Sequence, residues 1–409
     1  MNLSFGPLPD GRDAANAQQK GIRSLDPVPD LDVREPGREP LLVQPARLRD
    51  EAGRIVEAEQ LLYAIGKLGR RPGRDQHSAQ DTEPLRRRDR IYWPGCASAT
   101  VPHVNLHRGI AARSGGFLLF AVTPPRLTTR PPEAAEIGRV TLERLRPLAI
   151  DGLVLYDIDD ESDRNPDERP FPFLPTMDPA DYLDRDLAGL DVPAIVYRAV
   201  GKYREDRFRS WLEQQDPSQA LTVFVGSSSR EKAVLTSLAR AYELREQVQP
   251  ELLLGGVAIA ERHARLGDEH LRLIAKQIAG CSFFVTQIVY DVNAAKNLIS
   301  DYHHECDAQN LEPVPIVFSF SVCGSLKTLE FLQWLGVTVP RWIENELRHA
   351  DDTLDASYEQ AVTTAVDLIA FCRRLGVPFG LNVESVSIRK AEIEASVRLA
   401  TQLGAELRN

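Results

Sequence analysis

The sequence predicts a (β/α)8 TIM barrel that follows a mostly disordered N-terminal extension. Eight short apolar runs alternate with eight stretches of helical spacing, and this alternation fills the chain from residue 117 onward. Eight strand and helix units over about 300 residues are the number and the size expected of a (β/α)8 barrel. Strands that alternate with helices in this way form a parallel sheet.

The clearest unit covers residues 252–290. It begins with a short apolar run interrupted by glycine and continues with the polar residues Glu261, Arg262 and His263. An amphipathic stretch, Gly280 and a second apolar run follow. This order predicts a strand, a polar loop, a helix and a second strand, with both strands buried on two faces. A parallel pair of strands needs such a crossover.

The other elements follow the same alternation. The predicted strands are 117–122, 152–158, 194–200, 221–225, 252–259, 282–289, 316–320 and 379–383. The predicted helices are 133–148, 179–190, 203–214, 230–247, 268–279, 292–307, 326–375 and 388–407. A doubly wound open sheet is the rival fold, but it often places a phosphate-binding turn after its first strand. Here that strand ends in Thr123, Pro124 and Pro125, and proline has no N–H group to offer a phosphate. The barrel is therefore favoured.

Residues 1–95 differ from the rest of the chain. They are rich in Pro, Arg, Asp and Gln and contain few aromatic residues, so they cannot bury much apolar surface. We expect a disordered extension with one short helix over residues 52–66, and a barrel domain over residues 96–409. The extension is either a tail that binds a partner or translated sequence without structural meaning.

The composition restricts the class of protein. The chain is 43% hydrophobic and 26% charged, which is typical of a soluble globular protein, and its net charge of -10 disfavours nucleic acid as a partner. Five cysteines without CxxC spacing, and the lack of a signal peptide or a long apolar run, predict a reduced cytoplasmic protein with no membrane partner. Residues 341–352, with Phe331 and Trp334, could line a lid or the interface of a homo-oligomer.

The residues that follow each barrel strand form the active face of such a fold. In this chain they are carboxylates, amides and hydroxyls with one arginine and one histidine, a set that suits a polar heterocycle and proton transfer. The set is Thr123, Asp157, Asp159, Asp160, Arg198, Ser227, Ser228, Ser229, Glu261, His263, Gln287, Tyr290, Ser319, Ser321, Cys323, Asn382 and Glu384. We expect no metal site, because His263 is isolated and His303 and His304 lack a carboxylate at ligand spacing.

Four segments together carry a resemblance. They are GGVAIAERH from Gly255, FFVTQIVYDV from Phe283, TPPR at the end of the first strand, and Leu381-Asn382 near the last strand. Over residues 115–409 the chain resembles the methylenetetrahydrofolate reductases. The resemblance implies a (β/α)8 barrel carrying FAD that reduces 5,10-methylenetetrahydrofolate to 5-methyltetrahydrofolate with NADH or NADPH. Such an enzyme acts in one-carbon metabolism and methionine biosynthesis.

The resemblance implies that Gln287 contacts the folate pterin, since it matches a glutamine of the family. Positions beyond the strands add Asn382, Tyr290 and Asp157 as substrate-binding candidates. Each has a plainer explanation as well. Gln287 could fill a polar layer of the barrel mouth, and the acidic run that contains Asp157 is more often a solvated loop.

The resemblance also implies cofactor contacts. Glu269 and Lys276 match a helix that faces the FAD phosphates and ribose in the family. We add Ser227, Ser228 and His263, which follow strands; hydroxyl and N–H groups at a helix start bind phosphate. The two serines could equally cap a helix that starts at residue 230.

Two acidic positions of the family are replaced. Ala121 stands where the family has its general acid, and Ser227 stands where it has an aspartate near the flavin. We expect Glu384 or Glu261 to supply the proton instead, although Glu384 could merely charge the start of the last helix. A flavin-independent transfer of hydride from NAD(P)H to folate is a physically reasonable variant. The alternatives are a folate-binding sensor or partner subunit without reductase chemistry, and an enzyme for another pterin that carries a one-carbon group.

Overall fold

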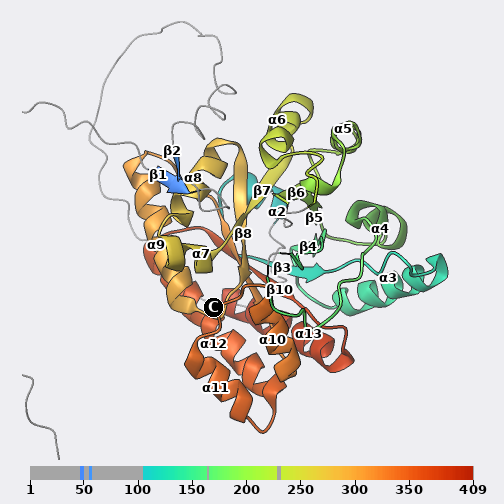
Figure 1. The fold of residues 1–409 in the computed structure, drawn as a ribbon, viewed down its shortest axis with the longest axis vertical. Helices are drawn as coiled ribbons and strands as arrows, with labels where there is room; N and C mark the ends of the chain where they lie inside the picture. The colour runs from blue at the N-terminus through green and yellow to red at the C-terminus, as the bar shows by residue number, and fades with distance from the viewer. Residues whose placement is uncertain (1–46, 50–54, 58–104, 164, 228–231, 409) are drawn as a thin grey trace, which may run out of the picture. The chain divides into compact units, whose positions relative to one another are not determined.

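The computed structural model describes residues 47–49, 55–57, 105–163, 165–227 and 232–408. Within residues 105–408, parallel strands close into a barrel in the order β10-β3-β4-β5-β6-β7-β8-β9 (Figure 1). This closed sheet confirms the predicted (β/α)8 barrel. The strands are β3 (Phe117–Val122), β4 (Gly152–Leu155), β5 (Ala194–Ala199), β6 (Leu221–Val225), β7 (Leu253–Ala258), β8 (Cys281–Ile288), β9 (Ile316–Ser321) and β10 (Phe379–Glu384).

Helices follow the strands and surround the barrel (Figure 1). Those that connect β3 to β9 are α3 (Pro131–Leu145), α4 (Pro179–Asp186), the 3-10 turn η1 (Val200–Lys202), α5 (Glu205–Glu213), α6 (Leu238–Val248), α7 (Ala260–Leu266), α8 (Glu269–Ile278) and α9 (Val292–Ala308). Three helices lie between β9 and β10, and one follows β10. They are α10 (Leu326–Trp334), α11 (Arg341–His349), α12 (Thr353–Leu375) and α13 (Lys390–Arg408).

Alternate residues of each strand fill the barrel interior, because successive side chains of a strand point to opposite faces. On β3 the inward residues are Phe117, Leu119 and Ala121, and they belong to one buried apolar cluster with residues of the other strands. A short helix, α2 (Leu106–Ala111), adds Leu106 and Ile110 to this cluster. Leu106 also lies against the first residue of β4, so α2 closes the amino-terminal end of the barrel.

Several predicted elements differ from the structure. The helix predicted over residues 52–66 is wrong where β2 (Ile55–Glu57) pairs with β1 (Arg47–Arg49). The helix predicted from residue 230 begins at Leu238, where the Ser237 side chain accepts the first-turn N–H of Arg240. The long helix predicted over residues 326–375 is three helices. Gly336, with a φ of +92°, and Pro340 interrupt it.

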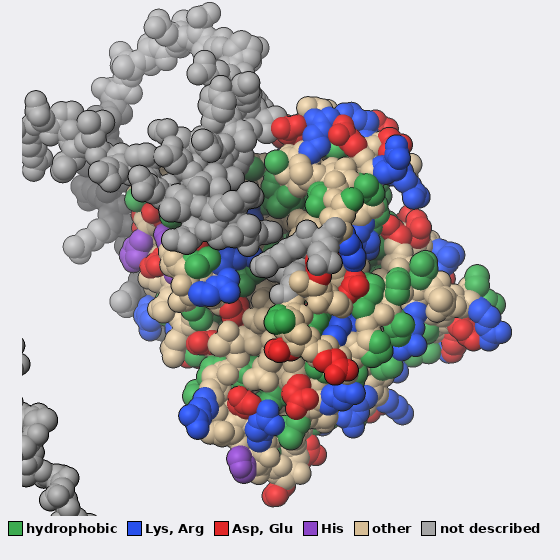
Figure 2. All heavy atoms as spheres, viewed as in Figure 1, with side chains coloured by type: hydrophobic (Ala, Val, Ile, Leu, Met, Phe, Trp, Pro, Cys, Tyr) green, Lys and Arg blue, Asp and Glu red, His purple; other side chains and the backbone are tan. Residues whose placement is uncertain are grey.

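Charged residues of both signs lie side by side on the described surface that Figure 2 presents. The helices that the structure describes include none long and apolar enough to cross a membrane. Four cysteines lie in the same part of the chain, at positions 281, 306, 323 and 372, and all are buried and unpaired. The predicted disorder before residue 96 falls almost entirely outside the described residues.

The tight interior predicts a stability effect at Gly255. A Cβ atom at this position would lie 2.5 Å from the ring of Phe283 and 2.8 Å from Val223. Gly255→Ala should therefore destabilise the barrel by about 1–3 kcal/mol, the usual cost of overpacking a core. Urea denaturation measures the change. The control is Gly226→Ala, whose Cβ would meet its nearest neighbour at 3.8 Å and which should change stability little; equal losses in both variants would contradict this description of the interior.

Candidate functional site

The carboxyl ends of the strands bring Glu384 beside Ala121. β10 pairs with β3 in parallel, and Glu384 is the register partner of Ala121. Glu384 is partly buried and follows Gly380 and Asn382 on the inward face of β10. The Glu384 carboxyl group thus lies one strand away from Ala121, at the same height in the barrel.

A polar cluster surrounds Glu384 at the barrel mouth. The Tyr156 hydroxyl is hydrogen-bonded to the Glu384 carboxyl and accepts a hydrogen bond from Nδ2 of Asn382 at 3.1 Å. The same amide nitrogen donates to Oγ of Ser319, also at 3.1 Å. The rings of Tyr156 and Tyr197 meet edge to face, with centroids 4.9 Å apart. Asn382 is fully buried, and its Oδ1 has no hydrogen-bond partner among the described residues.

The environment of Glu384 favours the neutral acid. Burial raises the pKa of the Glu384 carboxyl to about 7, and the hydrogen bond from Tyr156 opposes this only in part. The pKa of the Tyr156 hydroxyl is also raised, by burial first and then by the charge of Glu384. A carboxyl group with a pKa near neutrality can donate a proton and recover it at the same pH. Glu384 therefore has the properties of a general acid.

The second predicted acid, Glu261, lies in the first turn of α7. Its pKa is raised to about 7 by burial, while the N–H group of Thr338 donates to the carboxylate and opposes the shift. Nε2 of Gln287 donates to the carbonyl of Leu335 at 3.0 Å. Residues 335–340 connect α10 to α11. One loop therefore contacts both Glu261 and Gln287, and it fixes the orientation of the Gln287 amide.

The loop after β4 packs against α10. Nε1 of Trp334 donates to the carbonyl of Asp167 at 2.9 Å, and Nδ2 of Asn165 donates to the carbonyl of Trp334 at 3.0 Å. The guanidinium of Arg169 stacks on the rings of Phe331 and Trp334, at 5.0 and 5.2 Å from their centroids. Phe331 and Trp334 thus contact a neighbouring loop of the same chain. Whether this part of the chain forms a lid or a subunit interface stays a prediction.

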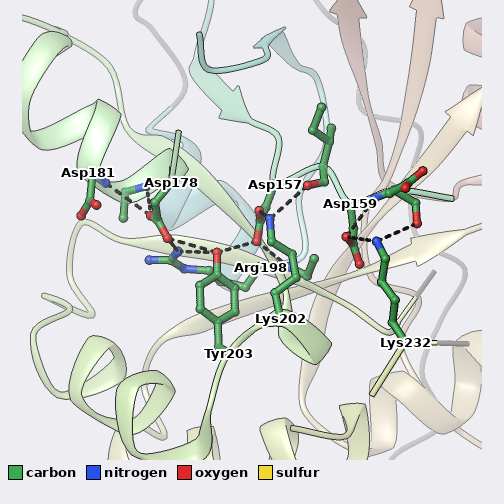
Figure 3. A network of polar contacts seen from close by, with 12 residues as sticks. Asp157, Asp159, Asp178, Asp181, Arg198, Lys202, Tyr203 and Lys232 are labelled. Atoms are coloured by element: carbon green, nitrogen blue, oxygen red, sulfur yellow. Dashed lines mark hydrogen bonds and ion pairs between the residues drawn. The ribbon is translucent and has the colours of Figure 1, made fainter. Parts of the chain in front are cut away.

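Asp157, a predicted substrate-binding residue, is held by groups of the protein. It is buried, and its carboxylate accepts hydrogen bonds from the N–H group of Ala199, the Lys202 ammonium and the Tyr203 hydroxyl. Figure 3 shows this network continuing through Tyr203 to Arg198 and Asp178. The acceptor oxygens of Asp157 are therefore engaged by the protein itself, and they hold η1 against the end of β4.

Tyr290 is also placed differently from its prediction. Its ring is buried among Leu329, Leu332 and Ile343, in an apolar cluster formed with α10 and α11. Burial raises the pKa of its hydroxyl, which lies close to Cys323 and Ser357. The chain turns after β8, because Asp291 caps α9 by accepting from the N–H groups of residues 293 and 294. Tyr290 therefore supports the packing of α10 rather than the Glu384 cluster.

Two of the residues predicted to contact FAD, Glu269 and Lys276, have internal partners that do not fit that role. Glu269 is fully buried and accepts hydrogen bonds from the N–H group of Ile259 and from Arg262. Lys276 donates to the carbonyl of Val257 at 2.6 Å, between α8 and β7. A buried carboxylate would repel a phosphate, and both groups already have protein partners. We derive no step through FAD.

The remaining cofactor candidates give a mixed result. His263 is buried and faces Asp301 on α9, with Nε2 3.1 Å from Oδ2, so the prediction that it is isolated is wrong. The nearby prediction for His303 is also wrong, since Asp307 lies 3.5 Å from it at helical spacing. Ser227 packs beside Gly201 of η1. Ser228 lies outside the described residues. The helix that it was expected to cap begins at Leu238 instead of residue 230.

Two residues of the cluster, Tyr156 and Tyr197, were missing from the predicted site. Tyr156 lies directly beyond β4, and Tyr197 lies on β5. Both follow the inward alternation of their strands, after Val154 and Ile195. The period of two along each strand was the signal that could have identified them. The predicted site included mainly polar residues beyond the strands and left out these two aromatic residues at the strand ends.

Comparison with known proteins supports a family assignment. A family model described as methylenetetrahydrofolate reductase matches residues 256–387. The structure of a protein from Clostridium thermocellum is 43% identical, with a TM-score of 0.65, and the match covers 74% of this chain and 99% of that chain. The chain belongs to the methylenetetrahydrofolate reductase family. The Clostridium thermocellum relative is described as an uncharacterized protein that binds two copies of 5-methyl-5,6,7,8-tetrahydrofolic acid.

More distant likenesses add nothing to the family assignment. A GH113 β-1,4-mannanase is 9% identical with a TM-score of 0.40, over 71% of this chain and 99% of that chain. A dihydropteroate synthase from Xanthomonas albilineans is 13% identical with a TM-score of 0.36, over 73% and 96%. Neither likeness supports a conclusion about this methylenetetrahydrofolate reductase family member. No curated protein matches the chain.

The raised pKa of Glu384 predicts a pH-dependent stability difference between the wild type and Glu384→Gln. Glutamate has a pKa near 4.5 when unfolded and about 7 here, so the wild type loses stability as pH rises from 4.5 to 7. The glutamine variant lacks this loss. The free energy of unfolding of the variant, relative to that of the wild type, should rise by roughly 3 kcal/mol at most between pH 4.5 and 7. Above pH 7 the difference between the two proteins should stay constant.

Urea denaturation at several pH values measures this difference. Glu394→Gln is the control, because Glu394 is largely exposed on α13. A difference between wild type and Glu384→Gln that stays constant from pH 4.5 to 7 would contradict the proposed environment of Glu384.

Proposed function

We propose that this protein reduces 5,10-methylenetetrahydrofolate to 5-methyltetrahydrofolate with NAD(P)H. The observation that carries the proposal is the Glu384 carboxyl, paired in register with Ala121 and raised in pKa to about 7. Family membership supports the substrate class. The 43% identical relative binds 5-methyltetrahydrofolate, which is the product of this reaction.

The proton step falls to Glu384. Opening the five-membered imidazolidine ring breaks one C–N bond of the methylene bridge and leaves an iminium cation. The carboxyl proton of Glu384 is transferred to the departing nitrogen, and the resulting carboxylate remains hydrogen-bonded to Tyr156. A positioned acid typically contributes about 10²–10⁴-fold to such a step. Tyr156 orients the carboxyl group and does not replace it, since its own pKa is raised.

The hydride step requires a donor held close to the iminium carbon. We propose that NAD(P)H donates the hydride directly, which gives NAD(P)+ and the methyl group. The support is that Glu269 and Lys276 both have internal hydrogen-bond partners, which disfavours contacts of these two residues with FAD. The reaction balances without a further redox group, because one hydride and one proton enter the substrate.

The pterin is assigned to the mouth beside Glu384. Gln287 offers its amide near the carboxyl end of β8, and Asn382 is fully buried two residues before Glu384, with an Oδ1 atom that has no partner among the described residues. Gln287 is oriented by the Leu335 carbonyl. Amides that are fixed before binding cost less conformational entropy on binding, which favours selective recognition of a flat polar heterocycle.

A second candidate function is folate binding without turnover, in a sensor or partner subunit. The observation in its favour is Ala121, which stands at the position of the family's general acid. The two candidates share the binding site and differ only in the proton step. Turnover therefore separates them.

Activity should not depend on added flavin. The purified protein should oxidise NADH or NADPH when 5,10-methylenetetrahydrofolate is present, at the same rate with and without FAD. Glu384→Gln should lower kcat by at least about tenfold, within the range for a positioned acid, while Glu394→Gln should not. Activity that depends on FAD would contradict direct hydride transfer. A tenfold loss of kcat in Glu261→Gln, with no loss in Glu384→Gln, would assign the general acid to Glu261 on α7.

Removal of the Gln287 amide tests the binding site independently of turnover. Gln287→Ala should weaken the binding of 5-methyltetrahydrofolate by about 5–30-fold, the effect of losing one or two hydrogen bonds. Isothermal titration calorimetry measures the affinity. Gln309→Ala is the control, because Gln309 is exposed at the end of α9. Unchanged affinity in Gln287→Ala would remove this residue from the site.

A further inference from the structure

Helices α7, α8 and α9 pack against one another on the outside of the barrel (Figure 1). Each contributes one side chain to a compact group: His263 from α7, His270 from α8 and Asp301 from α9. One ligand atom from each residue lies within 4.8 Å of the other two. The rings of His263 and His270 meet edge to face, with centroids 5.2 Å apart. These residues are far apart in sequence and are brought together only by the packing of the three helices.

The group contains buried polar atoms that the protein itself does not satisfy. Nδ1 of His263 and Nδ1 of His270 are both buried and have no hydrogen-bond partner among the described residues. His263 as a whole is only 5% exposed. Buried polar atoms without partners are rare in folded proteins, and a bound ion is one of their ordinary explanations.

The charges around the group favour a cation. Burial first and His263 second lower the pKa of the His270 ring, and the nearby carboxylates of Asp301, Glu305 and Asp268 oppose this in part. Asp268 also pairs with Arg272 at 3.5 Å, so its charge is partly neutralised, whereas Asp301 has a side chain that is 52% exposed. The exposed side of Asp301 gives an ion a route from solvent to the buried imidazole of His263.

We propose that His263, His270 and Asp301 bind a zinc ion. Two imidazoles and one carboxylate form a familiar set of three zinc ligands, and water completes the tetrahedron. Bonds of about 2.0–2.1 Å bring tetrahedral ligand atoms to roughly 3.3 Å of one another, so the side chains close in slightly when the ion binds. The ion ties α7, which carries Glu261, to α8 and α9. Its role is to hold this helix in place, and it takes no part in the proposed reduction.

A second histidine group on α9 provides an internal control. His303, His304 and Asp307 also lie within reach of one another, but all three come from one helix. His304 and Asp307 are exposed, and adjacent residues such as His303 and His304 do not share one helix face. Variants of this group therefore report on nonspecific binding by surface histidines.

The test is metal binding by the full chain after treatment with a chelator. Zinc is added and the content is measured by elemental analysis, while cobalt(II) is used as a coloured probe of tetrahedral coordination. The wild type should bind one more zinc ion per chain than either Asp301→Asn or His270→Gln does. Each of these variants should weaken zinc binding by more than about tenfold, since even the loss of an outer contact of a zinc ligand costs that much. His304→Gln should bind zinc as the wild type does.

Hydrogen exchange supplies a second readout. Zinc should slow exchange of the backbone amides of α7 in the wild type and leave them unchanged in Asp301→Asn. Because Asp301 is half exposed, this variant is expected to fold even if His270→Gln does not. Failure of the wild type to bind zinc, or a loss of zinc only in His304→Gln, would overturn the proposal. The assay needs no folate and no NAD(P)H, so its outcome is separate from that of the reductase activity.

Discussion

The pairing of β10 with β3 is the constraint on which the rest of the structure depends. It closes the barrel and sets the height of every inward residue at the seam, because a shift of one residue would turn Glu384 away from the interior. Closure in this register puts Glu384 beside Ala121 and within reach of Tyr156. The register of this one strand pair therefore fixes where the Glu384 carboxyl group lies at the mouth.

Burial of the mouth is the second condition for the proposed chemistry. The loop over residues 335–340 contacts Glu261 and Gln287, and α10 packs against the loop after β4 through Trp334 and Arg169. Burial raises the pKa of Glu261, while the N–H group of Thr338 in this loop opposes the rise. The loop between α10 and α11 thus forms part of the environment of Glu261 and Gln287.

The sequence predicted the strands well, because buried parallel strands have a strong local signal in apolar residues. It also predicted Gln287, Asn382 and Glu384 at the mouth, since strand ends place them there. The partners of Asp157 and Glu269 could not be predicted. Their hydrogen bonds come from η1 and from the start of α7, and spacing along a chain does not show which side chains meet across elements. The contact between His263 and Asp301 could not be predicted for the same reason.

The central claim is that Glu384 is a carboxyl group held near neutrality for proton transfer. The most direct measurement is the pKa of Glu384 itself, from infrared difference spectra between the wild type and Glu384→Gln over a pH titration of the ligand-free protein. We expect a carboxyl band that disappears near pH 7. A band that disappears near pH 4.5, the ordinary value for glutamate, would contradict it.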